Sequence, residues 1–189
     1  MSTGAVLMRA SEVVGLPVVT IDCGEDVAEV KDVVYSPDEG RLLGFTLNKR
    51  GFLRGRMKEV LAAESVAAVG HDAVMIEDDS CLASPADAPE EVARPAPNRN
   101  VLGNTVMTET GVRLGEVTDL VLELGGRLEV VGYQLKGDDA KSERFIPLPA
   151  QLAVSGQALV VPAPTEEFVF DDLSGFGAGV ADFRARLGR

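Results

Sequence analysis

The sequence is poor in the residues that most often carry chemistry or a large core. It contains no tryptophan, two tyrosines, one histidine and two cysteines among 189 residues. With so few aromatic side chains, the core must be built from aliphatic ones, and β-branched residues such as valine pack well on sheets. Cys23 and Cys81 lie far apart and in no metal-binding spacing, so neither a disulfide framework nor a zinc site is expected.

Long apolar runs and excess positive charge are also absent. No run approaches the roughly 18 residues that span a bilayer, and the first residues lack the basic and apolar regions of a secretory signal. Together with unpaired cysteines, this predicts a soluble cytoplasmic protein. The 30 acidic and 18 basic residues give a net charge of -12, a field that as a whole repels nucleic acid and anionic membranes.

The clearest feature present is an internal repeat. Leu42–Leu47 and Val130–Leu135 share a glycine, an aromatic residue and a leucine in the same phase, at an offset of 132 − 44 = 88. Two more blocks match in the same order, 14–20 with 102–108 and 29–33 with 116–120. Apolar residues alternate with small or polar ones in the strand blocks, which is typical of half-buried strands. These blocks predict a duplicated domain.

We therefore predict an all-β fold made of two tandem small β-barrels of about six strands each. Short helical turns are expected at 9–14 and 100–102, and a short helix near the C-terminus. Closing each sheet into a barrel would remove its edges. The predicted strands lie at 17–22, 27–36, 41–48, 56–61, 65–69 and 73–77, then at 104–109, 114–123, 127–136, 143–148, 151–155 and 158–162.

The predicted domains are a first repeat at 5–80 and a second at 98–165. An acidic, proline-rich linker at 81–97 joins them, and a tail follows at 166–189. The linker favours an extended, semi-rigid connector; a proline-motif ligand is the alternative, but no aromatic or basic docking pattern accompanies it. Because domains this small are only marginally stable alone, we expect the two repeats to pack against each other.

The ordered set of motifs resembles the PRC-barrel domain. In the first repeat it comprises Val13-Val14-Gly15, Val30-Lys31-Asp32-Val33 and Leu43-Gly44-Phe45-Thr46-Leu47. In the second it comprises Val101-Leu102-Gly103, Val117-Thr118-Asp119-Leu120, Val131-Gly132-Tyr133-Gln134-Leu135 and Arg144-Phe145-Ile146-Pro147-Leu148. The first repeat departs at Met57–Leu61 and at Ala28, where the second has Gly115. The resemblance implies protein docking, at times within RNA-rich or membrane-bound assemblies, without catalysis by the barrel.

No residue pattern indicates an enzyme. The single histidine, His71, lies in a turn beside Asp72, where such a side chain is usually solvated. Asp32 and Asp119 recur in both repeats, but a carboxylate before a turn is expected to accept backbone N–H bonds, and no acid–base partner accompanies it. Gly175–Gly179 lacks the spacing of a phosphate loop. We predict no catalytic, cofactor-binding or metal-binding residues, and no cofactor.

Two stretches are predicted to bind partners. One is a basic loop with Lys49, Arg50, Phe52, Leu53, Arg54, Arg56 and Lys58, suited to an acidic protein, RNA or anionic lipid. The other is the aromatic tail with Phe168, Phe170, Phe176, Phe183 and Leu187, suited to a partner's groove. The alternatives are a solvated hairpin for the loop, and a tail that packs on the chain's own surface.

The functional prediction is a non-enzymatic adaptor for protein interaction or assembly, whose protein partner the sequence leaves open. A ribosome- or RNA-maturation-associated factor that uses the 49–58 loop is the first alternative. A small-ligand carrier or enzyme with a site between the repeats is the second.

Overall fold

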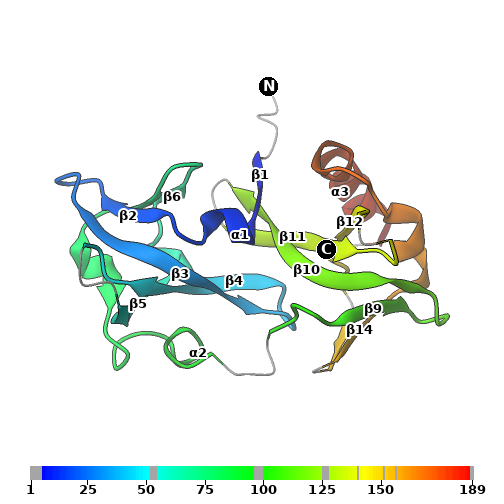
Figure 1. Cartoon of the computed structure of the whole chain (residues 1–189), viewed down its shortest axis with the longest axis horizontal. Coiled ribbons are helices and arrows are strands. Elements are labelled where there is room, and N and C mark those ends of the chain that lie inside the picture. Colours follow the sequence, from blue (N-terminus) through cyan, green and yellow to red (C-terminus); the bar gives the residue numbers. More distant parts are fainter. Residues whose placement is uncertain are drawn as a thin grey trace.

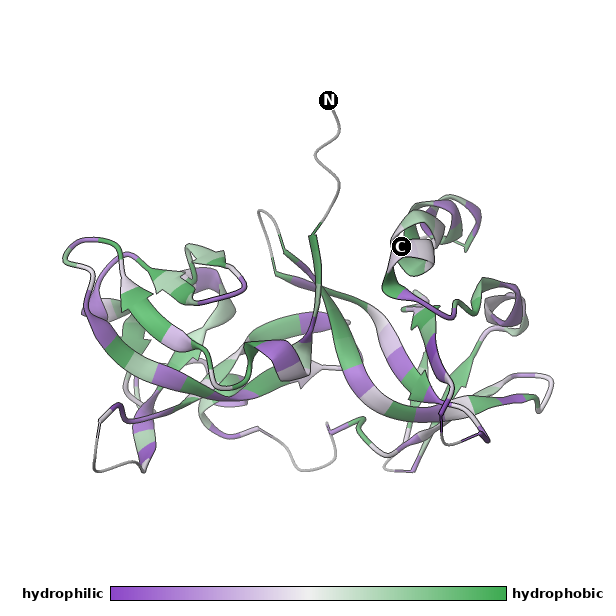
Figure 2. Ribbon diagram, turned by 45° about the horizontal axis from the view of Figure 1, so that its top comes forward, coloured by the Kyte–Doolittle hydropathy of each residue, from purple (hydrophilic) through white to green (hydrophobic). Residues whose placement is uncertain are grey.

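The computed structural model describes residues 6–51, 55–95, 100–124, 128–139, 141–150, 152–155 and 157–187. Strands dominate the fold, and the strands carry both hydrophobic and hydrophilic residues (Figures 1 and 2). The N-terminal part contains β1 (Val6–Arg9), α1 (Ala10–Val13), β2 (Pro17–Thr20), β3 (Asp26–Ser36), β4 (Arg41–Asn48), β5 (Arg56–Ala62), η1 (Ala63–Ser65), β6 (Ala68–Val69), β7 (Val74–Ile76), η2 (Asp79–Cys81), β8 (Leu82–Ala83) and α2 (Glu90–Ala93). The C-terminal part contains β9 (Thr105–Thr108), β10 (Arg113–Leu124), β11 (Glu129–Lys136), β12 (Glu143–Pro147), β13 (Ala153–Val154), β14 (Ala158–Val161), η4 (Ala163–Phe168) and α3 (Leu173–Leu187).

The first repeat (β2–β8) and the second repeat (β9–β14) have the same topology. A long central strand, β3 or β10, pairs antiparallel with the strands before and after it. A late strand then returns parallel to the first one, β7 beside β2 and β14 beside β9. The duplication predicted from the sequence is therefore confirmed by strand order as well as by motif.

The predicted all-β class with two tandem repeats is confirmed, but the described strands do not close into complete barrels. Among the described residues, β6 pairs only with β7, and β13 pairs only with β14, so the sheet is not closed. These two strands are two residues long, too short to continue the ladder around a barrel. The two repeats instead join into one sheet at β4 and β11, where Arg41 lies opposite Glu129.

That junction relates the two repeats by an approximate two-fold axis. Arg41 and Glu129 are equivalent positions, since 129 − 41 = 88, and an antiparallel pair of equivalent residues is what a two-fold axis produces. Buried side chains from both repeats form one continuous apolar cluster. Within it the hydroxyls of Tyr35 and Tyr133 lie 2.6 Å apart. The expected packing of the repeats against each other is thus observed.

The strand β1 was not predicted, and it crosses from the first repeat to the second. It pairs with the end of β10, from Val6 opposite Leu124 to Arg9 opposite Val121. The Arg9 Nε donates to Gln134 Oε1 at 2.6 Å, and the guanidinium lies 5.6 Å from the centre of the Phe145 ring. The N-terminal segment is therefore part of the second repeat's sheet (Figure 1).

The segment predicted as an extended linker packs on the first repeat instead. Its strand β8 pairs with β5, and Val92 of α2 is buried against Val34, Leu43 and Val60. This apolar patch on the outer face of the sheet needs a cover, which α2 supplies. None of the helices within the described ranges is long and apolar enough to cross a membrane.

Candidate functional site between the two repeats

The basic loop is partly neutralised by its own repeat. Arg50 forms ion pairs with Asp26 at 2.5 Å and with Glu29 at 2.9 Å. The hydrogen bond to the Asp26 carboxylate raises the pKa of the Arg50 guanidinium. The exposed cations that remain among the described residues of the loop are Lys49, Arg56 and Lys58. Phe52, Leu53 and Arg54 lie outside the described residues.

The aromatic tail is not an exposed docking motif. Its side chains Phe168, Phe176 and Phe183 are buried, while Phe170 and Leu187 are half-buried. These side chains are buried because α3 covers the outer face of the second repeat, where it packs against Val121, Val131 and Phe145. The prediction that these phenylalanines are available to a partner is therefore wrong, and the alternative, that the tail packs on the chain's own surface, describes the structure.

The repeated aspartates differ between the two repeats. The Asp119 carboxylate is buried and accepts bonds from the backbone N–H of Leu120 at 2.8 Å and of Ser11 at 3.2 Å. Asp32 is exposed, and its carboxylate accepts no hydrogen bond from the described part of the chain. Both line a second hollow of about 670 Å³ between the repeats. Asp119 thus has the structural role expected of a carboxylate before a turn.

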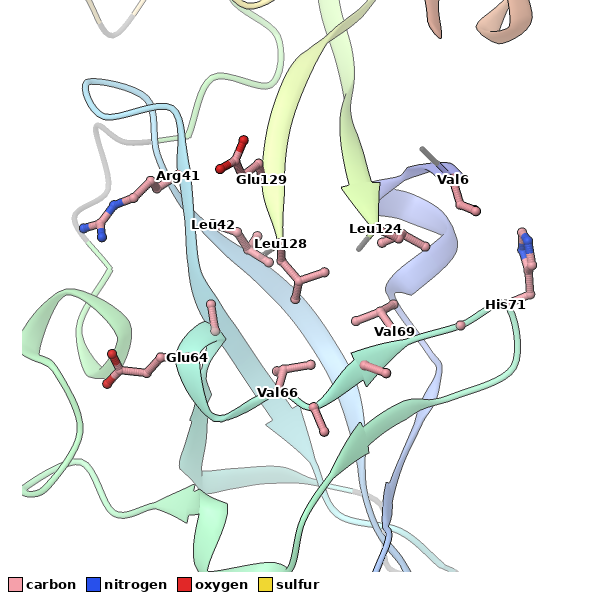
Figure 3. Close-up of a pocket in the computed structure, with 14 residues that line it drawn as sticks. Val6, Arg41, Leu42, Glu64, Val66, Val69, His71, Leu124, Leu128 and Glu129 are labelled. Carbon is pink, nitrogen blue, oxygen red and sulfur yellow. The ribbon is translucent and has the colours of Figure 1, made fainter. Parts of the chain in front are cut away.

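The strongest candidate site is a cleft of about 660 Å³ between the repeats, shown in Figure 3. One wall is the stretch from Ala63 to His71, which contains β6. The opposite wall is formed by the ends of β10 and β11 together with Val6. Its apolar lining consists of Val6, Leu42, Val66, Val69, Leu124 and Leu128. Because these side chains come from both repeats, only the assembled fold creates the cleft.

Charged groups surround the apolar part of the cleft. Glu64, Glu129 and Arg41 lie at one end, and His71 lies at the other (Figure 3). Arg41 is already paired with Glu39 at 2.5 Å. An apolar centre inside a polar rim is the usual composition of a protein-binding surface.

Because the two repeats are related by an approximate two-fold axis, the cleft residues can be compared with the equivalent residues of the other repeat. The counterparts of Leu124 and Leu128 are Pro37 (124 − 37 = 87) and Gly40 (128 − 40 = 88). The fold therefore tolerates a proline and a glycine at the positions equivalent to Leu124 and Leu128. The apolar lining is a property of this cleft and not a requirement of the repeated fold.

None of these lining residues is among the sequence-predicted site residues. They are single aliphatic residues from separate segments, and each also fits a half-buried strand. The usable signal was the difference between the two hairpins, where Leu124 and Leu128 replace Pro37 and Gly40. The sequence could show that difference, but not that β6 faces it.

The family of the chain was identified by comparison with known proteins. A search of curated protein sequences gives no match. The family model described as PRC-barrel domain matches residues 6–80 and again residues 97–168. The two matches cover most of the chain and coincide with the two repeats, and the chain therefore belongs to the PRC-barrel domain family.

Proposed function

We propose that the chain is a non-enzymatic protein-interaction adaptor of the cytoplasm, and that a partner protein binds in the cleft between the repeats. The family supports this proposal only in general terms, as a domain of docking proteins. The observation that carries it is the apolar lining of the cleft, which the positions equivalent to Leu124 and Leu128, namely Pro37 and Gly40, do not share.

Exposed apolar side chains gathered at one place are costly unless they are used. Val6 remains 47% exposed although it begins a paired strand. Leu124 and Leu128 are half-buried, so each keeps apolar surface for a partner to cover. Covering such surface stabilises a complex by about 25 cal/mol per Å² of apolar area.

The RNA-associated alternative has less support. The net charge of -12 opposes binding of RNA, and the pairing of Arg50 with Asp26 and Glu29 removes one cation from the 49–58 loop. The outcomes of one experiment separate the two functions, because RNA-mediated contacts are lost on nuclease treatment and weaken steeply with salt.

The experiment is affinity capture from a nuclease-treated lysate of the source cells, read by quantitative mass spectrometry. Wild-type protein is compared with Leu128→Asn, which places a polar amide in the cleft. The matched control is Val112→Ser, at a residue that is 40% exposed and outside the cleft. Thermal melts of all three proteins check that each is folded.

The adaptor proposal predicts one set of proteins enriched by the wild type and by Val112→Ser. Their recovery should fall at least about fivefold with Leu128→Asn, the loss expected when about 1 kcal/mol of binding free energy is removed. Equal recovery with all three proteins, or recovery only of nuclease-sensitive ribosomal material, would contradict it.

A further inference from the structure

The cleft wall contains an open strand edge. The chain is extended as it leaves η1 at Val66, and within the described ranges β6 pairs only with β7. Val66, Val69 and Gly70 all line the cleft. In Figure 3 the strand that carries Val69 borders the cleft, and its partner strand lies on the far side. The unpaired edge of β6 therefore faces the cleft.

The hydrogen-bond pattern identifies the backbone groups on that edge. Gly70 N donates to Ala73 O at 2.9 Å, so these two residues form a hydrogen-bonded pair. Antiparallel pairs alternate between bonded and non-bonded, which makes the next pair, Val69 opposite Val74, the non-bonded one. The N–H and C=O of Val69 therefore point away from β7, and Val69 itself lines the cleft.

A strand edge of this kind binds extended peptides, because unpaired N–H and C=O groups are a ready template for another strand. Within this molecule, β1 is an example of a segment that adds as a strand to a sheet. Strand β1 arrives from outside the second repeat and pairs with the end of β10. There, backbone pairing is combined with an anchored side chain, since Arg9 bonds to Gln134.

The chemistry of the cleft limits what such a segment carries. Its apolar lining requires apolar side chains, which in an extended peptide project from alternate residues. At the rim, Glu64 forms no ion pair within the described part of the chain, and Glu129 has only Arg184 at 3.6 Å. Arg41 is paired with Glu39. At the rim the carboxylates of Glu64 and Glu129 thus outnumber the guanidinium of Arg41. Because the whole chain also has a net charge of -12, this charge distribution favours a basic partner.

We propose that the cleft binds an extended, basic segment of a partner protein, which adds as a strand to the free edge of β6. This inference rests on the proposed docking function and specifies how the partner binds. The segment bonds to the Val69 backbone, places alternate apolar side chains against Val66, Leu124 and Leu128, and directs lysine or arginine toward Glu64 and Glu129.

The test uses a defined probe, the fluorescein-labelled peptide Lys-Val-Thr-Val-Lys-Val-Thr, in fluorescence anisotropy. Two peptide controls are the same sequence with glutamate in place of lysine, and the same sequence with N-methylated valines, which removes N–H donors needed for a strand. The protein variant is Val69→Pro. It deletes an N–H that points away from β7, so the β6–β7 ladder is retained.

The matched control variant is Val154→Pro, because Val154 occupies the same position in β13, opposite Leu159 and next to Ser155, which donates to Ala158. We expect the lysine peptide to bind wild type and Val154→Pro equally. Affinity should fall at least about tenfold with Val69→Pro and with either control peptide. In ¹⁵N spectra, hydrogen exchange of the Val69 amide should slow when the peptide is added.

Three outcomes would overturn the strand-addition mode: no binding up to about 1 mM peptide, wild-type affinity for Val69→Pro, or no added protection of the Val69 amide. Leu128→Asn separates this from failure of the docking function. Binding that needs Leu128 but survives Val69→Pro would retain the cleft as a docking site and reject strand addition. Binding unaffected by either variant would reject both.

Discussion

Gly44 and Gly132, the equivalent glycines of the repeated motif, leave no room for a side chain. A Cβ on Gly132 would lie 2.3 Å from Ile146 O and 2.5 Å from Cζ of Phe176. A Cβ on Gly44 would lie 2.3 Å from Leu61 O and 2.9 Å from Cγ1 of Val92. In both repeats a neighbouring strand and a covering helix thus approach the same backbone position, which explains the glycine in both copies of the motif.

Gly132→Ala should therefore destabilise the protein by about 1–3 kcal/mol, as overpacking of a filled core does. Denaturant-induced unfolding measures the change. Gly55→Ala is the control, because nothing lies within 4 Å of a Cβ at that position. An equal change in the free energy of unfolding for the two variants would show that the close approach is not what requires glycine at 132.

The two repeated aspartates should respond differently to the same substitution. Asp119→Ala leaves the N–H groups of Ser11 and Leu120 without their acceptor, which costs about 1–3 kcal/mol when such groups are buried. Asp32→Ala removes an exposed side chain and should change stability by less than about 0.5 kcal/mol. Equal losses in urea unfolding would contradict the separate roles assigned to the two carboxylates.

At the scale of elements, the duplication extends beyond the strands. After the parallel return strand, β7 or β14, the chain comes back to the strand that follows the central hairpin, β8 to β5 and Phe170 to Phe145. It then forms a helix over the outer face, α2 with Val92 or α3 with Phe176. The apparent linker and the apparent tail are thus the same element in two copies, short in one and long in the other.

Removal of the α3 anchor should expose the outer face of the second repeat. Phe176 is fully buried against Val131 and Phe145, so Phe176→Ala should cost about 3–5 kcal/mol. Leu187→Ala, at a half-buried position near the end of the same helix, should cost less than about 1 kcal/mol. Chemical denaturation gives both values, and a neutral Phe176→Ala would mean that α3 is not part of the folded core.

At the scale of the whole molecule, the two repeats share one core. The continuous apolar cluster, the Arg41–Glu129 pairing and the Tyr35–Tyr133 contact all cross between them. Strand β1 adds a further link, because it belongs to the first repeat in sequence and to the second in its pairing. Such a molecule cannot lose one repeat without exposing the apolar surface of the other.

Thermal unfolding should accordingly be a single cooperative transition. Scanning calorimetry should give equal calorimetric and van't Hoff enthalpies, the test of two-state behaviour. Two resolved transitions, or a calorimetric enthalpy about twice the van't Hoff value, would mean that the repeats unfold independently and that the interface contributes little.

The sequence by itself determined the duplication, the all-β class and most strand positions. These features are local, because alternation of apolar residues and turn residues at fixed spacing are properties of neighbouring positions. The alignment of Leu42–Leu47 with Val130–Leu135 was enough to place equivalent strands, and the same motifs indicated the family that the comparison then established.

Only the tertiary structure decided which apolar residues are buried in the core and which line the cleft. Phe176 and Phe183 appeared available in the sequence, yet α3 buries them, whereas Leu124 and Leu128 looked like ordinary strand ends and line the cleft. Likewise, only the arrangement of the described strands shows that β6 has a neighbouring strand on one side, β7. The physical reason is that burial depends on contacts between distant segments, which hydrophobic pattern alone does not encode.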